Sequence, residues 1–199
     1  MDDPYKTRKT LIQRVQQQCD EESWGEFYKT YNRFIYALIR RMNISEHDAD
    51  DLSQEVLLKL WNKLPSIELN KKMRFRNMIA TITKNCVIDM IRKKEREDVR
   101  LKKAAEDENT AYLKSIRLPE IDELTETQWK IHISNLAMQN IAPFFSGHAL
   151  EVFQLSLQGH TIKEIATKLD LKERSVSRLK TRVKTRLTQE IARLRTELE

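Results

Sequence analysis

Apolar residues recur at every third or fourth position along most of the chain, which is the period of an amphipathic helix. The strongest stripe predicts a helix ending near Met42, with Ser23 and Glu26 as an N-terminal capping box. Its apolar members are Trp24, Phe27, Tyr28, Tyr31, Ile35 and Leu38. A shorter stripe over residues 11–19 predicts a helix before it. Both stripes indicate helices with one face turned to a core.

The apolar stripes continue toward the C-terminus, and a gap between them divides the chain into two predicted domains. They predict helices over residues 46–63, 74–103, 128–141, 148–158, 162–169 and 173–198, with a loop over 64–73. Residues 98–126 lack a sustained apolar period, which is typical of a linker. The predicted fold is all-α: one helical domain over residues 1–97, an acidic linker over 98–126 and a second helical domain over 127–199. Core candidates in the second domain are Trp129, Ile133, Leu136, Ile141, Leu150, Phe153 and Leu157.

Composition agrees with a helical protein. The chain has 199 residues but only 3 glycines and 4 prolines, too few for the many tight turns of a sheet protein. Cys19 and Cys86 have no partner at metal-binding or redox spacing, so we expect reduced, buried thiols. The N-terminus is polar and no apolar run has the length of a membrane helix. We therefore expect a cytoplasmic protein without membrane insertion.

Charge is unevenly distributed along the chain. The formal net charge is +6. The sequence carries net −2 over residues 1–62, +8 over 63–103, −5 over 104–127 and +5 over 128–199. Two basic blocks separated by an acidic spacer favour two separate contacts with a polyanion such as a nucleic acid.

Residues 161–187 have the pattern of a helix-turn-helix. Ala166 is small where two helices cross, and Asp170 occupies the turn position that usually takes glycine. Val176 and Leu179 follow at the spacing that packs a second helix onto the first. Thr161 and Glu164 form a capping box for the first helix. This combination is harder to obtain by chance than a basic helix alone.

The second helix of this motif presents hydrogen-bond donors that suit DNA. Donors of this kind reach base edges and phosphates from a helix in the major groove. The alternative is a helical hairpin whose basic face is only solvated. The candidate residues are Lys172, Arg174, Ser175, Ser177, Arg178, Thr181 and Arg182, with Lys180, Lys184 and Arg186 as further backbone contacts.

Three stretches together resemble a known family. In order and spacing, residues 48–61, 74–94 and 149–187 are similar to the polymerase-binding helix, the promoter-melting helix and the minus-35 reader of bacterial RNA polymerase sigma factors of the extracytoplasmic-function (ECF) type. The resemblance implies two helical domains that bind core RNA polymerase and promoter DNA. It covers nearly the whole chain except the linker.

The resemblance assigns the acidic helix to polymerase binding. The carboxylates and amide involved are Asp48, Asp50, Asp51, Gln54 and Glu55. For an isolated helix, a solvated acidic face that favours the helix dipole would be the simpler interpretation.

The resemblance also implies that the minus-10 element binds the long basic helix and the loop before it. Family members hold the non-template strand there and flip a base into a pocket. Flipping costs a few kcal/mol, which phosphate contacts in the +8 block would offset. The implied residues are Asn70, Lys71, Lys72, Met73, Lys84, Asn85, Asp89, Arg92 and Lys93. For Asp89, a surface salt bridge to Arg92 or Lys93 is the equal alternative.

The chain departs from the family pattern at three positions of the helix-turn-helix. Asp170 replaces the turn glycine, Lys180 stands where many relatives have an apolar residue, and Ser175 stands where threonine is frequent. Leu179 would then pack onto the first helix in place of the apolar residue that relatives have at position 180. The phase of the recognition helix, and with it the set of base-reading residues, depends on these positions.

The function favoured by the sequence is a sigma factor, with core polymerase and promoter DNA (duplex minus-35, single-stranded minus-10) as partners. Many family members are silenced by an anti-sigma factor, which adds that class to the candidate partners. The alternative is a stand-alone helix-turn-helix regulator with an N-terminal effector or dimerisation domain. A nucleic-acid enzyme is disfavoured, because the sequence has no phosphate loop, no metal-binding spacing and no convincing triad. We therefore expect no catalytic, cofactor or metal site.

Overall fold

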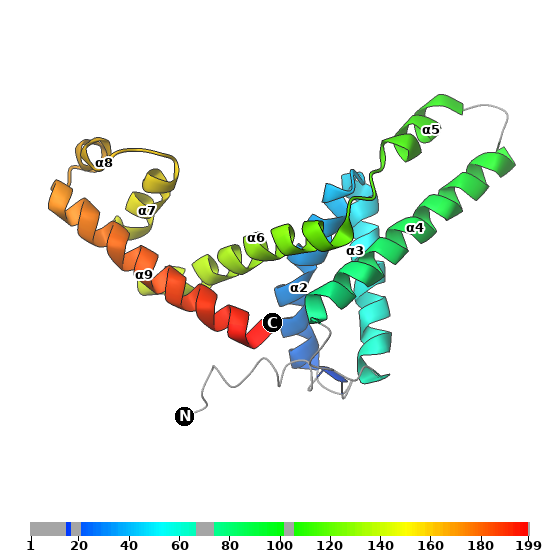
Figure 1. Cartoon of the computed structure of the whole chain (residues 1–199), viewed down its shortest axis with the longest axis horizontal. Helices are drawn as coiled ribbons and strands as arrows, with labels where there is room; N and C mark the ends of the chain where they lie inside the picture. The colour runs from blue at the N-terminus through cyan, green and yellow to red at the C-terminus, as the bar shows by residue number, and fades with distance from the viewer. Residues whose placement is uncertain (1–14, 17–20, 67–73, 102–105, 199) are drawn as a thin grey trace. The chain divides into compact units, whose positions relative to one another are not determined.

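A computed structural model of the chain describes residues 15–16, 21–66, 74–101 and 106–198, and in these ranges every regular element is a helix (Figure 1). The predicted all-α fold is confirmed. The helices are α2 (Glu21–Arg41), α3 (Glu46–Lys63), the 3₁₀ helix η1 (Leu64–Ser66), α4 (Phe75–Leu101), α5 (Glu106–Ser115), α6 (Ile121–Ile141), the 3₁₀ helix η2 (Ala142–Phe144), α7 (Ala149–Leu157), α8 (Ile162–Lys168) and α9 (Glu173–Leu198). None of these helices is both long and apolar enough to cross a membrane.

The chain forms two compact units whose boundary differs from the predicted domain limits. The first unit reaches His132, and the second spans Ile133–Glu197. The boundary therefore lies within α6, beyond the predicted linker. The assignment of separate functions to the two units stays a prediction.

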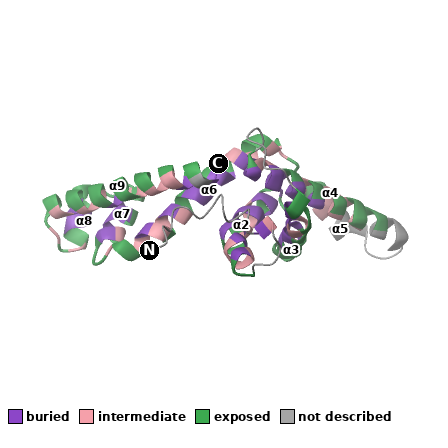
Figure 2. Cartoon of the chain, turned by 90° about the horizontal axis from the view of Figure 1, so that it is seen from below, coloured by how far each residue is buried: buried purple, intermediate pink, exposed green. Residues whose placement is uncertain are grey.

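The first unit is built on α2, α3 and α4, which contact one another pairwise. Figure 2 shows their inward faces as buried. Aromatic rings fill the centre: the Phe75 ring lies 5.9 Å from Phe27 and 5.3 Å from Tyr31, centroid to centroid. Such edge-to-face pairs add to the stabilisation that apolar burial provides. The predicted core face of the second helix is thereby confirmed, except that Tyr28 is exposed.

Helix α2 begins earlier than the sequence predicted. Glu21 and Glu22 form its first turn, so Ser23 lies inside the helix and is buried rather than capping it. Carboxylates in a first turn favour the helix dipole, which explains this earlier start. The predicted helix over residues 11–19 falls largely outside the described residues, although Val15 and Gln16 are helical and Val15 is buried.

The predicted linker contains helices that pack on the first unit. Helix α4 continues to Leu101, α5 follows, and α6 begins at Ile121, seven residues before the predicted start at 128. Trp129 is buried and stacks on Tyr31 with 6.3 Å between ring centroids. The sequence placed Trp129 in the core of the second domain, and this was wrong, because the first half of α6 completes the first unit.

The second unit packs α7 and α8 against α9. Phe153, Ile141 and Val183 form one buried cluster with Ala149. Helix α7 is rotated relative to the prediction. Leu157 was expected to face inward but is 71 % exposed, whereas Val152 and Leu155 are buried. Ile133 is buried as expected, and Leu136 is half-buried.

Candidate nucleic-acid and protein interfaces

The helix-turn-helix consists of α8, a tight turn and α9. The Thr161 hydroxyl accepts a hydrogen bond from the Glu164 backbone N–H at 3.3 Å, and the Glu164 carboxylate accepts one from the Thr161 N–H at 2.7 Å. These two bonds form the predicted capping box. The backbone bond from Thr161, and then the side-chain bond, hold the pKa of Glu164 below its ordinary value. The start of α8 is therefore fixed as the sequence predicted.

The turn between the two helices has the left-handed residue that the sequence predicted. Asp170 has φ 51°, and the Leu171 N–H donates to the Ala166 carbonyl at 2.9 Å. This is the hydrogen bond of a Schellman motif, which ends a helix and redirects the chain. Asp170 therefore supplies the geometry that glycine more commonly supplies.

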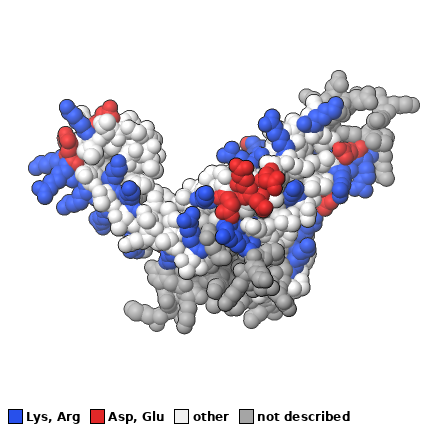
Figure 3. All heavy atoms as spheres, viewed as in Figure 1, with Lys and Arg blue, Asp and Glu red and all other residues white. Residues whose placement is uncertain are grey.

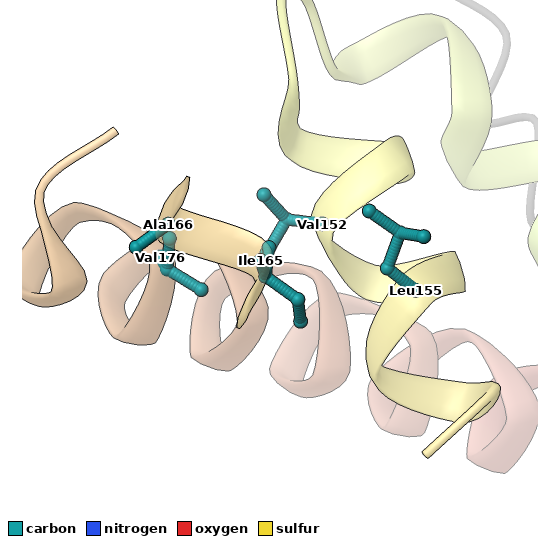
Figure 4. Close-up of a cluster of buried hydrophobic side chains, with 5 residues drawn as sticks. All are labelled: Val152, Leu155, Ile165, Ala166 and Val176. Carbon is teal, nitrogen blue, oxygen red and sulfur yellow. The ribbon is translucent and has the colours of Figure 1, made fainter. Parts of the chain in front are cut away.

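A small apolar core fixes the rotational phase of α9. Ile165, Ala166 and Val176 are buried together with Val152 and Leu155 from α7 (Figure 4). Leu179 packs against this cluster one turn after Val176. The neighbouring Lys180 is half-buried, so it is less available for backbone contacts than the sequence suggested. With Val176 and Leu179 inward, the opposite face of α9 is outward.

Most of the predicted minus-35 residues lie on that outward face. Figure 3 shows basic side chains gathered around the start of α9. Ser175 is half-buried, because it lies beside the buried Val176, and its predicted DNA contact stays a prediction. The exposed candidates are Lys172, Arg174, Ser177, Arg178, Thr181 and Arg182.

Arg182 has a neighbour that the sequence analysis missed. Its guanidinium lies 5.4 Å from the centroid of the Phe145 ring, and that of Arg186 lies 5.1 Å from Phe144. These cation–π contacts border a hollow of about 540 Å³. Phe145 follows η2, and no spacing in the sequence relates it to α9. Arg182 is therefore less free to reach DNA than Arg178.

The acidic face of α3 divides into exposed and engaged groups. Asp50, Asp51, Gln54 and Glu55 are exposed. The Asp48 carboxylate, with its side chain 18 % exposed, accepts hydrogen bonds from Lys94 Nζ at 2.8 and 2.9 Å. It also accepts one from the Tyr112 hydroxyl at 2.6 Å. Burial raises the pKa of Asp48, but the bonds from Lys94 and Tyr112 outweigh it and hold the pKa below its ordinary value.

A lysine on α3 joins the acidic face to α4. Lys59 Nζ lies 2.8 Å from the Glu55 carboxylate and 3.6 Å from that of Asp89. The hydrogen bond to Glu55 is the main reason that the pKa of Lys59 is raised. The proposed salt bridge of Asp89 to Arg92 or Lys93 is thus replaced by one to Lys59. Sequence spacing could not reveal the pair of Lys59 and Asp89, because its members lie on different helices.

Cys86 lies beside this lysine. It is free and buried, as expected for a reduced core thiol. Burial raises the pKa of the thiol, and Lys59 opposes that effect only in part. Cys19 lies outside the described residues.

The predicted promoter-melting residues are partly described. Asn85, Asp89, Arg92 and Lys93 are exposed on α4, and Lys84 is half-buried. The loop candidates Asn70, Lys71, Lys72 and Met73 lie outside the described residues. Asn85, Asp89 and Arg92 or Lys93 follow one another at helical spacing, so they share a face of α4.

The two predicted interfaces of the first unit meet in one hollow. It has a volume of about 300 Å³ and lies between α3 and α4. Asp51 and Glu55, assigned to polymerase, line it beside Asp89 and Lys93, assigned to DNA. Asp48, Leu52, Met90 and Lys94 complete the lining.

The comparisons with known proteins relate part of the chain to sigma factors. Residues 27–97 match the Sigma-70 region 2 family. The chain is 32 % identical over 76 residues to the ECF RNA polymerase sigma factor SigW of Bacillus subtilis, which is 38 % of this chain and 40 % of SigW. It is 29 % identical over 85 residues to the ECF RNA polymerase sigma factor SigE of Mycolicibacterium smegmatis, which is 43 % of this chain and 31 % of SigE. The matches thus span less than half the length of each relative, and over that part the resemblance predicted from the sequence is confirmed.

Proposed function

We propose, from the premise that residues 27–97 form a Sigma-70 region 2 domain, that the chain is a sigma factor of the ECF type. It would bind core RNA polymerase and direct it to specific promoters. The observation that carries the proposal is the order of parts: the matched segment contains α3 and α4, and a helix-turn-helix follows in the second unit. A sigma factor needs both a surface that binds core polymerase and a surface that binds promoter DNA.

The α3 face supports the polymerase contact. Asp50, Asp51, Gln54 and Glu55 are exposed on one helix whose opposite side is anchored by buried Leu52, Val56 and Leu60. A helix that is held by its buried side suits recognition of a basic protein surface, because its backbone needs no ordering on binding. Asp48 contributes less in the structure described, since both of its oxygens already accept hydrogen bonds.

The basic face of α4 supports the minus-10 contact. Arg92 and Lys93 are exposed for phosphates, and Asn85 offers an amide that can bond to a base edge. The loop residues 70–73 would complete the pocket for a flipped base. We infer that Asp89, which already neighbours Lys59 and lines the hollow, orients basic side chains rather than contacting phosphate.

The outward face of α9 supports the minus-35 contact. Arg174 and Arg178 are one helical turn apart and exposed, so both can enter the same stretch of major groove. Ser177 and Thr181 can add hydrogen bonds to bases or phosphates. In this proposal the chain acts in the cytoplasm and carries no catalytic chemistry, since the polymerase performs the reaction.

Binding to purified core polymerase tests the proposal. We expect the full chain to form a complex, and we expect the double substitution Asp51→Asn and Glu55→Gln to weaken it at least about tenfold, because two charged contacts are lost. Glu21→Gln with Glu22→Gln, which removes two exposed charges from the first turn of α2, is the matched control and should bind normally. A chain that binds duplex DNA but never core polymerase would instead be a stand-alone helix-turn-helix regulator.

A further inference from the structure

The last turn of α5 and the two residues after it are anchored to the turn between α2 and α3. We name residues 112–117 the strap. The Tyr112 hydroxyl accepts a hydrogen bond from the Ser45 N–H at 3.1 Å and donates one to Asp48 at 2.6 Å. The Asn43 side-chain amide donates to the Ser115 carbonyl at 3.0 Å. The strap is thus fastened at both the N-cap and the first turn of α3.

A fourth hydrogen bond fastens the other end of the strap. The Arg117 N–H donates to the Met42 carbonyl at 3.0 Å, just beyond the last residue of α2. The strap therefore satisfies backbone groups that the ends of α2 and α3 would otherwise expose to water. These contacts join residues that are 64 to 75 positions apart, so they are tertiary contacts and not the local bonds of a turn.

The strap also organises the charges at this end of the hollow. Lys94 Nζ lies 5.1 Å from the centroid of the Tyr112 ring while it binds Asp48. A desolvated cation over an aromatic face is stabilised by the ring quadrupole. Asp48 and Lys94 both line the hollow that holds Asp51, Glu55 and Lys93. The strap thus holds one member of the acidic face and one of the basic helix in an intramolecular contact.

We propose that the strap is an autoinhibitory contact, which competes with core polymerase for the N-terminal end of α3. The proposal rests on the proposed function. In the closed state Asp48 is bound by Tyr112 and Lys94, so its carboxylate is not available to a partner protein. Polymerase would then bind only the open fraction, which lowers its apparent affinity by that fraction.

The affinity of the full-length chain for core polymerase tests this competition. Tyr112→Phe removes the phenolic hydroxyl and keeps the ring, and we expect it to tighten binding by about tenfold because a charge-assisted hydrogen bond of the closed state is lost. Asn43→Gly removes a different strap bond, and glycine keeps the positive φ of 62° at that position. It should tighten binding by about threefold.

Tyr28→Phe is the matched control. Tyr28 is an exposed tyrosine whose hydroxyl bonds only within α2 among the contacts described, to Asn32. It should leave the affinity unchanged. If both Tyr112→Phe and Asn43→Gly bind polymerase as the wild type does, or more weakly, the strap does not compete with polymerase. The proposed function would still stand, because the wild type binds polymerase.

Amide hydrogen exchange of the free chain provides the second readout. The Ser45 and Arg117 amides should be protected in the wild type and exchange faster in Tyr112→Phe. Rapid exchange at both amides in the wild type would show that the strap is open and would overturn the proposal. Protected amides together with no polymerase binding by any variant would instead overturn the proposed function, and with it the competition.

Discussion

The Arg76 guanidinium donates two hydrogen bonds to one oxygen of the Glu126 carboxylate, from Nε at 3.0 Å and from Nη2 at 2.8 Å. Arg76 is 2 % exposed and lies on α4, whereas Glu126 is 41 % exposed and lies on α6. The Arg76 guanidinium also lies 5.7 Å from the centroid of the Trp129 ring. The pair thus fixes the first half of α6 to the first unit.

Substitution of Glu126 should weaken the first unit. Glu126→Gln removes the negative charge opposite a buried guanidinium, and we expect the free energy of unfolding to fall by about 1–2 kcal/mol, less than for a fully buried pair because water reaches the carboxylate. Urea denaturation measures this change. Glu123→Gln, exposed on the same helix, should leave the midpoint unchanged. Equal midpoints for both variants would show that the pair contributes nothing.

The contribution of Glu126 should depend on pH. The hydrogen bond from Arg76 holds the pKa of Glu126 below its ordinary value. A carboxyl with a lowered pKa in the folded state stabilises it fully above the ordinary pKa, and this stabilisation is lost as the pH falls through the folded value. The stability difference between the wild type and Glu126→Gln should therefore be full at neutral pH and shrink below about pH 4.5. A difference that stays constant into strong acid would contradict the assignment.

The turn of the helix-turn-helix offers a stabilising substitution. Asp170 has a positive φ, which costs free energy in any residue with a Cβ atom, although less in Asp than in most. Asp170→Gly removes that cost and should raise the thermal stability of the second unit by up to about 1 kcal/mol. Asp170→Val should instead lower stability, since a β-branched residue tolerates a positive φ poorly. Stabilisation by valine would show that the turn is not left-handed in solution.

Substitution of Arg178 tests whether DNA and core polymerase bind different surfaces of the chain. Arg178→Ala should weaken binding to minus-35 duplex DNA by about 1–3 kcal/mol and reduce its salt dependence if a phosphate contact is lost. Binding to core polymerase should be unaffected, because that contact is assigned to α3. Arg195→Ala removes the same charge from the far end of the same helix and serves as the control. Loss of polymerase binding in Arg178→Ala alone would mean that the surfaces are assigned wrongly.

Local patterns in the sequence predicted the helices and the turn well. The bounds of α3 match the predicted 46–63, and the capping box at Thr161 and the left-handed Asp170 are both present. Each depends on residues a few positions apart, whose preferences act within one helix or turn. The phase of α9 was left open by the three departures from the family pattern, and the packing of Val176 and Leu179 with Ala166 fixes it in the structure.

Tertiary pairs escaped the sequence analysis. Residues 98–126 were predicted to be a linker because they lack an apolar stripe, yet they contain Tyr112 and Glu126, whose partners Asp48 and Arg76 are 64 and 50 positions away. These contacts are polar, so they leave no hydrophobic period to detect. Asp48 was assigned to polymerase binding because its bonds to Lys94 and Tyr112 could not be seen in the sequence. In the structure its carboxylate is engaged by these two side chains.

Transcription by core polymerase most directly tests whether the chain is a sigma factor. Promoter fragments are first selected from a random DNA library with core polymerase and the full chain, and run-off transcription is then measured on the selected fragment. We expect a single specific transcript that requires the chain and is reduced by Arg178→Ala and by Asp51→Asn with Glu55→Gln. Binding of the chain to duplex DNA without any chain-dependent transcript would contradict the sigma-factor function.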